Sequence, residues 1–287
     1  MGDSSSPSMQ RRRLRNELRA ARLEKELTQE QVAAEMEWSL SKMNRIEKAK
    51  TSISANDLRA LLRLYDITDK KRTEELLALA RAARQHSWWQ VYSDVAPKTL
   101  LELIDYEFAA STISQFEPMF VPGILQTEEY ALAVLRVFHG EESPAERVPA
   151  LVNLRTRRRE LLEDDGAPQF SFLLDESVTR RLAGSPAITS RQLMHLVSRA
   201  DLPNVTIRVV PFTAGLYPGL KGAFKVIEFE DEPDESVAFL EGPRVDTVSD
   251  DPEETKSYLE TFDRIARLAL SPSDSVGLLR KAAGEMA

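Results

Sequence analysis

The sequence predicts two folded parts: an α-helical N-terminal helix-turn-helix bundle of five helices over residues 10–86, and a larger α+β domain with a small mixed sheet over residues 87–287. Three observations predict this. Amphipathic patterns with capping signals follow one another without a strand as far as residue 85. Beyond it, runs rich in Val, Ile and Phe alternate with helical patterns. The chain of 287 residues also exceeds the usual size of one core.

The N-terminal bundle follows from its caps and apolar spacing. Residues 1–9 are small and polar, and we expect a disordered tail there. The first helix is expected over 11–26 and the fifth over 69–85. The three helices between them begin at hydroxyl caps: Thr28, Ser39 and Ser54. Thr28 with Gln31, and Ser54 with Asp57, have the spacing of a capping box.

In the second domain, segments with the periodicity of a helix alternate with segments that have the pattern of a strand. Helices are expected near residues 98–110, 127–138, 145–163, 187–200 and 252–270. Strands are expected over residues 169–175, 204–212, 223–230 and 236–242. The segment 231–235 between the last two strands predicts a hairpin or short loop.

The charge is divided unequally between the two domains. Residues 9–72 hold 16 Lys and Arg against 10 Asp and Glu, a local charge of +6. Because Asp3 contributes −1 and the total is −8, residues 73–287 carry −13. This asymmetry favours a polyanion as the partner of the N-terminal part, although an ordinary solvated surface is also compatible with it.

The remaining composition narrows the class of protein. The chain has no cysteine, which excludes disulfides and thiolate metal sites. We find no apolar run that could span a membrane and no signal peptide, and expect a cytoplasmic protein without a cofactor.

The stretch TQEQVAAEMEWSLSKMNRIEKAK contains two short helices joined by a tight turn, as a helix-turn-helix requires. Its second helix would present polar side chains to the major groove of double-stranded DNA, with Gln29 and Arg13 directed at phosphates. The candidate residues on and before that helix are Ser39, Leu40, Ser41, Lys42, Asn44 and Arg45. The alternative is a five-helix bundle in which these residues are merely solvated.

This stretch resembles the DNA-binding domains of the Cro/XRE class, over roughly residues 11–66. The Thr-Gln pair of that class falls on Thr28 and Gln29, and its RIE on residues 45–47. The resemblance implies phosphate or base contacts for Gln29, Leu40, Ser41 and Arg45, whereas Lys42 and Asn44 are inferred from helix geometry. Ala49 departs from the usual Gly. A homodimer is expected, because operators for this fold are usually paired half-sites.

We find no catalytic motif in the larger domain: no phosphate-binding Gly-rich loop, no HExxH and no GxSxG. Asp175 and Glu176 at a strand end could act as an acid–base pair, but capping of the following helix is the preferred interpretation. An enzyme is therefore not expected.

The stretch FVPGILQTEEYALAVL, with SWW before it and VVPFTAGLYPGLKGAFKVIEF after it, resembles a domain that follows XRE domains in actinobacterial regulators, including WhiJ-like proteins. The resemblance implies an antitoxin-like regulatory domain that works with a small co-encoded protein partner. Arg155 and Arg158 match the RxxRQ helix of that domain, and Arg159 departs from its Gln. For the cluster RTRRR, a solvated helix face is favoured over a site for an effector anion.

Three functions remain open. The leading hypothesis is a sequence-specific transcriptional regulator whose second domain binds the partner protein. The second is a regulator that senses a small molecule through TAGLYPGLKG, with Tyr217 and Lys221 as candidate contacts. The third is an antitoxin or scaffold with a vestigial bundle. Trp88 and Trp89 could couple the domains to a partner or ligand, but a role in burying the linker is favoured.

Overall fold

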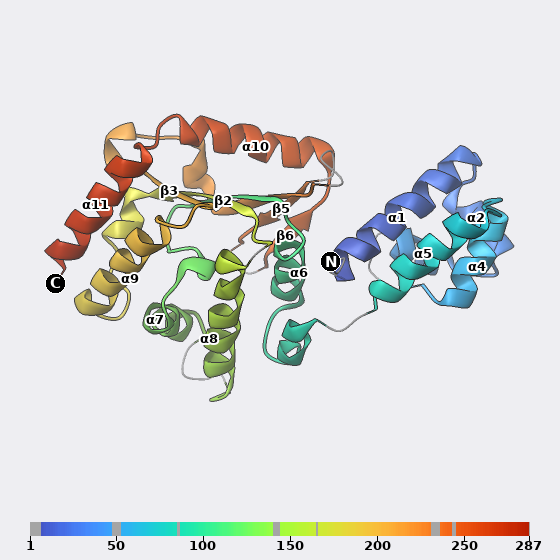
Figure 1. The fold of residues 1–287 in the computed structure, drawn as a ribbon, viewed down its shortest axis with the longest axis horizontal. Coiled ribbons are helices and arrows are strands. Elements are labelled where there is room, and N and C mark those ends of the chain that lie inside the picture. The colour runs from blue at the N-terminus through green and yellow to red at the C-terminus, as the bar shows by residue number, and fades with distance from the viewer. Residues whose placement is uncertain are drawn as a thin grey trace. The chain divides into compact units, whose positions relative to one another are not determined.

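The computed structural model describes residues 7–47, 53–84, 87–139, 144–164, 166–230, 236–242 and 245–286, with the side chains of 7–9 and 12 left out. The chain divides into two compact units, residues 1–90 and 91–287, whose elements are labelled in Figure 1. The boundary lies four residues after the one expected at 86/87. Ala49 and His86 lie outside the described residues.

The described part of the N-terminal unit contains five α-helices and no strand, as predicted. They are α1 (Pro7–Glu24), α2 (Gln29–Glu35), α3 (Leu40–Glu47), α4 (Ala55–Leu64) and α5 (Lys70–Ala82). The expectation of disorder was wrong for residues 7–9, because α1 begins at Pro7 and proline is favoured in the first turn of a helix. The core side chains include Leu18, Val32, Met43, Leu58 and Leu61.

The caps position α2 and α3. Thr28 and Gln31 form the complete capping box, and Ser39 Oγ accepts a hydrogen bond from the backbone N–H of Lys42 at 3.2 Å. Between the helices, Glu37 adopts a left-handed conformation with φ of 53°. At Ser54 only one hydrogen bond of the capping box forms, from the backbone N–H of Asp57 to the Ser54 hydroxyl. The carboxylate of Asp57 accepts a hydrogen bond from Lys42 instead.

The described residues of the second unit form a six-stranded mixed sheet in the order β3-β2-β1-β4-β5-β6. The strands are β1 (Thr112–Glu117), β2 (Gln169–Asp175), β3 (Val205–Val210), β4 (Phe224–Glu228), β5 (Val237–Leu240) and β6 (Thr247–Ser249). β1, β2 and β3 are parallel, and the other pairings are antiparallel. The predicted β4–β5 pairing is confirmed, although its connection 231–235 lies outside the described residues.

Helices cover both faces of this sheet (Figure 1). α10 (Pro252–Ala266) packs on one face, against β1, β3, β4 and β5. The other face is covered by α6 (Lys98–Glu107), α7 (Glu128–His139), α8 (Arg147–Arg158) and α9 (Pro186–Arg199), while α11 (Pro272–Glu285) packs against α9 and β3. The predicted helix over 145–163 is α8 followed by a 3₁₀ turn, Arg159–Glu163.

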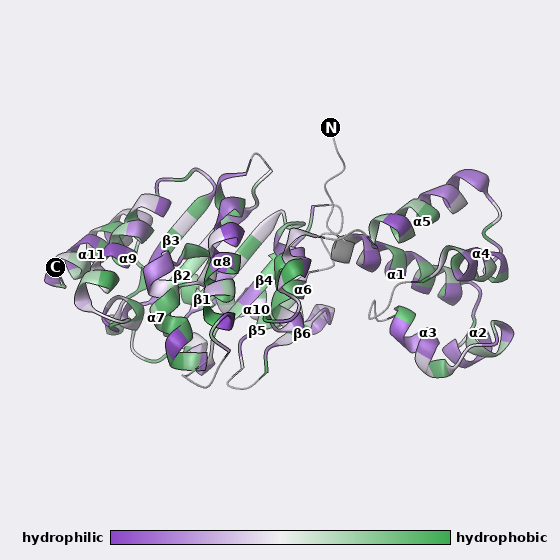
Figure 2. Cartoon of the chain, turned by 90° about the horizontal axis from the view of Figure 1, so that it is seen from below, coloured by the Kyte–Doolittle hydropathy of each residue, from purple (hydrophilic) through white to green (hydrophobic). Residues whose placement is uncertain are grey.

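The register of the sheet separates its apolar and polar faces. Phe116 of β1 and Phe224 of β4 are paired and belong to the apolar cluster with α10. Because side chains alternate along a strand, their neighbours Gln115, Glu117 and Lys225 point to the opposite face. Hydrophobic and hydrophilic residues also alternate along the helices of both units (Figure 2). In the described part of the chain, no helix has the length and apolar content to cross a membrane.

Candidate nucleic-acid interface

The recognition helix expected from the sequence is α3, and its two faces differ sharply. Met43, Ile46 and Glu47 are buried, with at most 7% of each residue exposed. The opposite face leaves Ser41 and Arg45 exposed and Lys42 and Asn44 half-buried. Ser39 and Leu40, at the start of the helix, are also exposed. Arg13 is half-buried on α1 and therefore lies on a different element from these residues.

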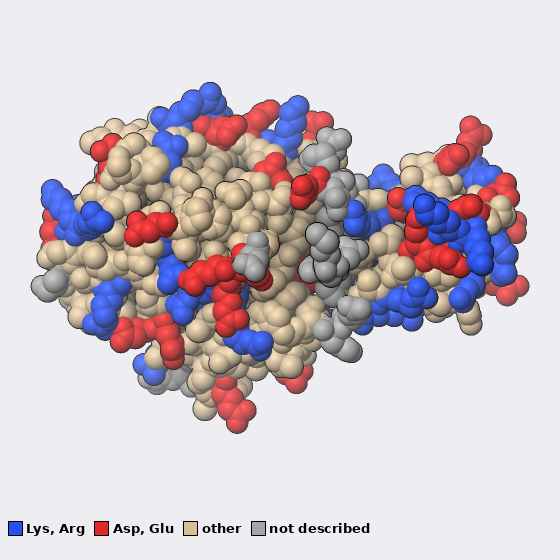
Figure 3. All heavy atoms as spheres, in the orientation of Figure 1, with Lys and Arg blue, Asp and Glu red and all other residues tan. Residues whose placement is uncertain are grey.

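Charged residues of both signs lie on the surface of each unit. On the side of the molecule that Figure 3 shows, Lys and Arg are interleaved with Asp and Glu in both units. The net positive charge of residues 9–72 therefore does not form one uniform basic stripe on that side.

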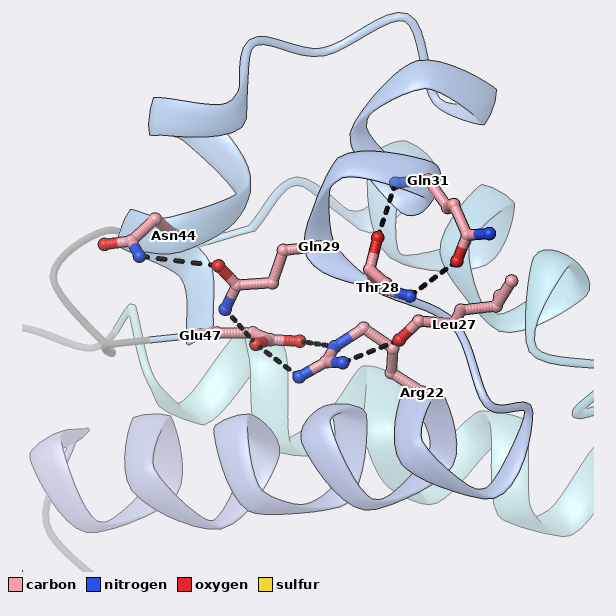
Figure 4. A network of polar contacts seen from close by, with 7 residues as sticks. All are labelled: Arg22, Leu27, Thr28, Gln29, Gln31, Asn44 and Glu47. Carbon is pink, nitrogen blue, oxygen red and sulfur yellow. Dashed lines mark hydrogen bonds and ion pairs between the residues drawn. The ribbon is translucent and has the colours of Figure 1, made fainter.

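A buried ion pair anchors α3 to α1 (Figure 4). Arg22 donates from Nε and Nη2 to the two carboxylate oxygens of Glu47, at 2.6 and 3.1 Å. Its Nη1 donates to the carbonyl oxygen of Leu27 at 2.7 Å, just before α2. The hydrogen bond to Glu47 raises the pKa of Arg22, so the guanidinium group is held in its charged form.

The same carboxylate organises the outer face. Gln29 Nε2 donates to Glu47 Oε2 at 2.5 Å, and Asn44 Nδ2 donates to Gln29 Oε1 at 3.4 Å (Figure 4). The side-chain amide of Gln29, which we expected to bind a phosphate, is thus engaged within the protein and orients Asn44. Arg22 and Glu47 were not among the predicted site residues. The sequence could have indicated Glu47, because it is an acidic residue at a position of α3 that the helical pattern directs inward.

Lys42 is held from two sides. Its ammonium group lies 3.1 Å from Asp57 Oδ2 of α4 and 3.9 Å from the centre of the Trp38 ring. The ion pair and the cation–π contact together restrict a side chain that would otherwise be flexible.

The candidate residues of the second unit do not form one site. Arg158 is only 5% exposed and binds both oxygens of Glu107, so the prediction of a solvated face for RTRRR is wrong at this position. Arg155 is half-buried and donates to Gln126. The burial follows from carboxylate and amide partners on other elements, which satisfy the guanidinium groups.

The loop TAGLYPGLKG is shaped by packing. Tyr217 is buried and donates a 2.5 Å hydrogen bond from its hydroxyl to Asp175, whereas Lys221 is exposed. A β-carbon on Gly219 would lie 2.7 Å from side-chain atoms of Ile265 and Phe116, so glycine is required there by the approach of the neighbouring elements.

The remaining candidates have structural partners. Asp175 caps the following turn by accepting from the backbone N–H of Ser177, as expected. Trp88 is half-buried and Trp89 is buried, with ring centres 5.5 Å apart in an edge-to-face arrangement. Within the described residues, no group of His, Asp or Glu side chains is arranged to hold a metal ion.

Comparison with known proteins matches each unit to a family. A model described as a helix-turn-helix domain matches residues 13–76, which include all of α2, α3 and α4. A model described as a domain of unknown function (DUF5753) matches residues 100–281, from α6 into α11. No curated protein and no solved structure matches the chain.

Proposed function

Since the chain belongs to the family defined by the domain of unknown function DUF5753 and carries a helix-turn-helix domain before it, we propose that it is a sequence-specific regulator of transcription that acts in the cytoplasm as a homodimer. The helix-turn-helix domain indicates DNA binding. The proposal of sequence-specific recognition rests on one observation. The buried pair Arg22–Glu47 anchors α3 to α1 and so orients the polar face of α3. The resemblance to Cro/XRE and WhiJ-like regulators supports it.

In this proposal, Ser41 and Arg45 contact base edges from the exposed face of α3, and Asn44 adds a contact whose direction is set by Gln29. A network that is formed before binding reduces the conformational entropy lost on DNA. The proposal assigns no catalysis to either unit.

The test is selection of binding sites from random duplex DNA, followed by titrations at several salt concentrations. The triple variant Ser41→Ala, Lys42→Ala, Arg45→Ala should bind the selected site no more tightly than it binds random DNA. A control variant, Lys71→Ala with Arg81→Ala, removes the same number of charges from exposed positions on α5. It should keep the preference. Equal specificity in the triple variant and the wild type would contradict the proposal.

We also propose that the DUF5753 domain binds a small co-encoded protein. An exposed apolar patch on and before α7 supports this: Met119, Val137 and Phe138 are 48%, 79% and 61% exposed, and Phe120 packs edge-to-face on Phe138. Exposed apolar side chains in contact with one another are typical of protein-binding surfaces.

The patch can be tested with the protein encoded beside this chain, titrated against full-length protein. Phe138→Lys should weaken binding at least tenfold, because it places a charge in an apolar interface. Leu216→Lys is the matched control, since Leu216 is 94% exposed and lies in the loop after β3. Absence of binding by the wild type, or equal loss in both variants, would refute the proposed surface.

A further inference from the structure

A buried cluster of charged and amide side chains lies on the sheet face opposite α10. Its centre is Glu107 of α6, which is fully buried and accepts hydrogen bonds from Arg158 of α8 and Lys225 of β4. Lys225 and Arg158 are 3% and 5% exposed. Three ionised groups are thus removed from water and satisfy one another.

The cluster extends to Gln126, which is 6% exposed and directly follows the 3₁₀ turn Gly123–Leu125. Arg155 Nη1 donates to the side-chain oxygen of Gln126 at 2.5 Å, and Arg159 Nη1 donates to its backbone oxygen at 3.3 Å. Gln126 is itself held by a 2.8 Å hydrogen bond from its Nε2 to the carbonyl oxygen of Val121. Arg155 and Arg159 are one helical turn apart and both half-buried, so they retain access to solvent.

One member of the cluster, Gln115, is incompletely satisfied. Gln115 Nε2 donates to Glu117 Oε1 at 2.6 Å, but in the described structure Gln115 Oε1 has no hydrogen-bond partner, although only 3% of the residue is exposed. A buried acceptor without a partner is costly. Glu117 is also buried, and burial together with the negative charge of Glu241 raises its pKa well above the usual value.

The charges do not balance without a further group. The cluster contains four cations, Arg155, Arg158, Arg159 and Lys225, against the carboxylates of Glu107, Glu117 and Glu241. Burial raises the pKa of both Glu117 and Glu241, so the four cations exceed the ionised carboxylates by at least one charge, which a bound anion would offset. Burial lowers the pKa of Arg155 to about 10, and an anionic neighbour would offset this effect of burial on the charged guanidinium.

We infer that this cluster binds a small organic monocarboxylate that also carries a hydrogen-bond donor. The carboxylate binds the accessible N–H groups of Arg155 and Arg159, and the donor reaches Gln115 Oε1. Arginine presents N–H groups in the geometry that a carboxylate accepts. The site is separate from the apolar patch of the partner proposal and does not depend on DNA binding.

Thermal unfolding of the full-length protein tests the inference, with sodium lactate, propionate, phosphate and chloride as probes at matched ionic strength. Lactate tenfold above half-saturation should raise the Tm of the second unit by about 3–6 °C over chloride. Lactate should bind about 5–10-fold more tightly than propionate, because its hydroxyl satisfies Gln115. Gln115→Met should remove that preference.

Arg155→Gln and Arg159→Gln should abolish the shift, whereas Arg157→Gln on the same helix should keep it. Arg159 lies at the rim, so its variant remains informative if Arg155→Gln fails to fold. The inference is wrong if lactate produces no shift in the wild type, if the shift survives in Arg159→Gln, or if phosphate stabilises more than the carboxylates do.

Discussion

The strongest prediction concerns the buried pair Arg22–Glu47. The side chains are 10% and 3% exposed, and Glu47 accepts hydrogen bonds from both Arg22 and Gln29. Glu47→Ala leaves the guanidinium buried without its carboxylate, which should cost about 3–5 kcal/mol. An apolar replacement of both partners, Arg22→Met with Glu47→Leu, avoids the unpaired charge and should restore stability to within about 1–2 kcal/mol of the wild type.

The two variants separate stability from positioning. In the double variant the fold is retained, but Gln29 Nε2 loses its acceptor and no longer orients Asn44. We therefore expect the affinity for a selected DNA site to fall about tenfold, equivalent to about 1.4 kcal/mol. The affinity for random DNA should change little, because non-specific binding is mainly electrostatic.

Hydrogen exchange of the full-length protein is the suitable stability assay, since peptides from α1 and α3 report on this unit and peptides from β1 and β2 serve as an internal control. DNA affinity is measured in parallel. A loss below 1 kcal/mol in Glu47→Ala would show that the pair is not buried as described. Wild-type DNA specificity in the folded double variant would refute the positioning role.

Three other predictions follow from single contacts. Asp57→Asn removes the carboxylate that pairs with Lys42, so the dependence of log K on log salt for random DNA should steepen by up to about 0.9, and an unchanged slope would contradict this. Burial lowers the pKa of His195 to about 4, so the unfolded chain binds a proton before the folded one and the stability falls as the pH drops from about 6.5 to about 4; unfolding of His195→Gln should show a flatter pH dependence over this range. Gly219→Ala should destabilise by about 1–3 kcal/mol by overpacking. Gly277→Ala, where a β-carbon meets nothing within 4 Å, should not destabilise.

The sequence predicts best where local chemistry decides the structure. The hydroxyl caps place the starts of α2, α3 and α4 correctly, because a cap and its helix are neighbours in the chain. β1 was missed because TISQFE places Ser114, Gln115 and Glu117 in buried positions, where an apolar pattern is expected. β6 and α11 were also not predicted. β6 has only three residues, too few to show a periodic pattern, and α11 contains Gly277 and Gly284, which weaken a helical pattern.

Pairing between distant residues explains the other misses. Glu107 is 51 residues from Arg158 and 118 from Lys225, and no local pattern indicates that they meet. The run RTRRR was therefore expected to be solvated, as arginine-rich helical faces usually are. Arg22 and Glu47, 25 residues apart, escaped the sequence analysis for the same reason.

Both units use a buried arginine–glutamate pair in the same way. In each, the pair joins two helices, α1 to α3 or α6 to α8, and leaves polar residues of the same helix at the surface. Such pairs add little net stability relative to apolar residues, but they allow few alternative geometries. If positioning is their role, Glu107→Leu combined with apolar replacement of Arg158 and Lys225 should preserve the sheet and abolish the carboxylate-dependent rise in Tm. Loss of the fold in that variant would instead assign the buried cluster to stability alone.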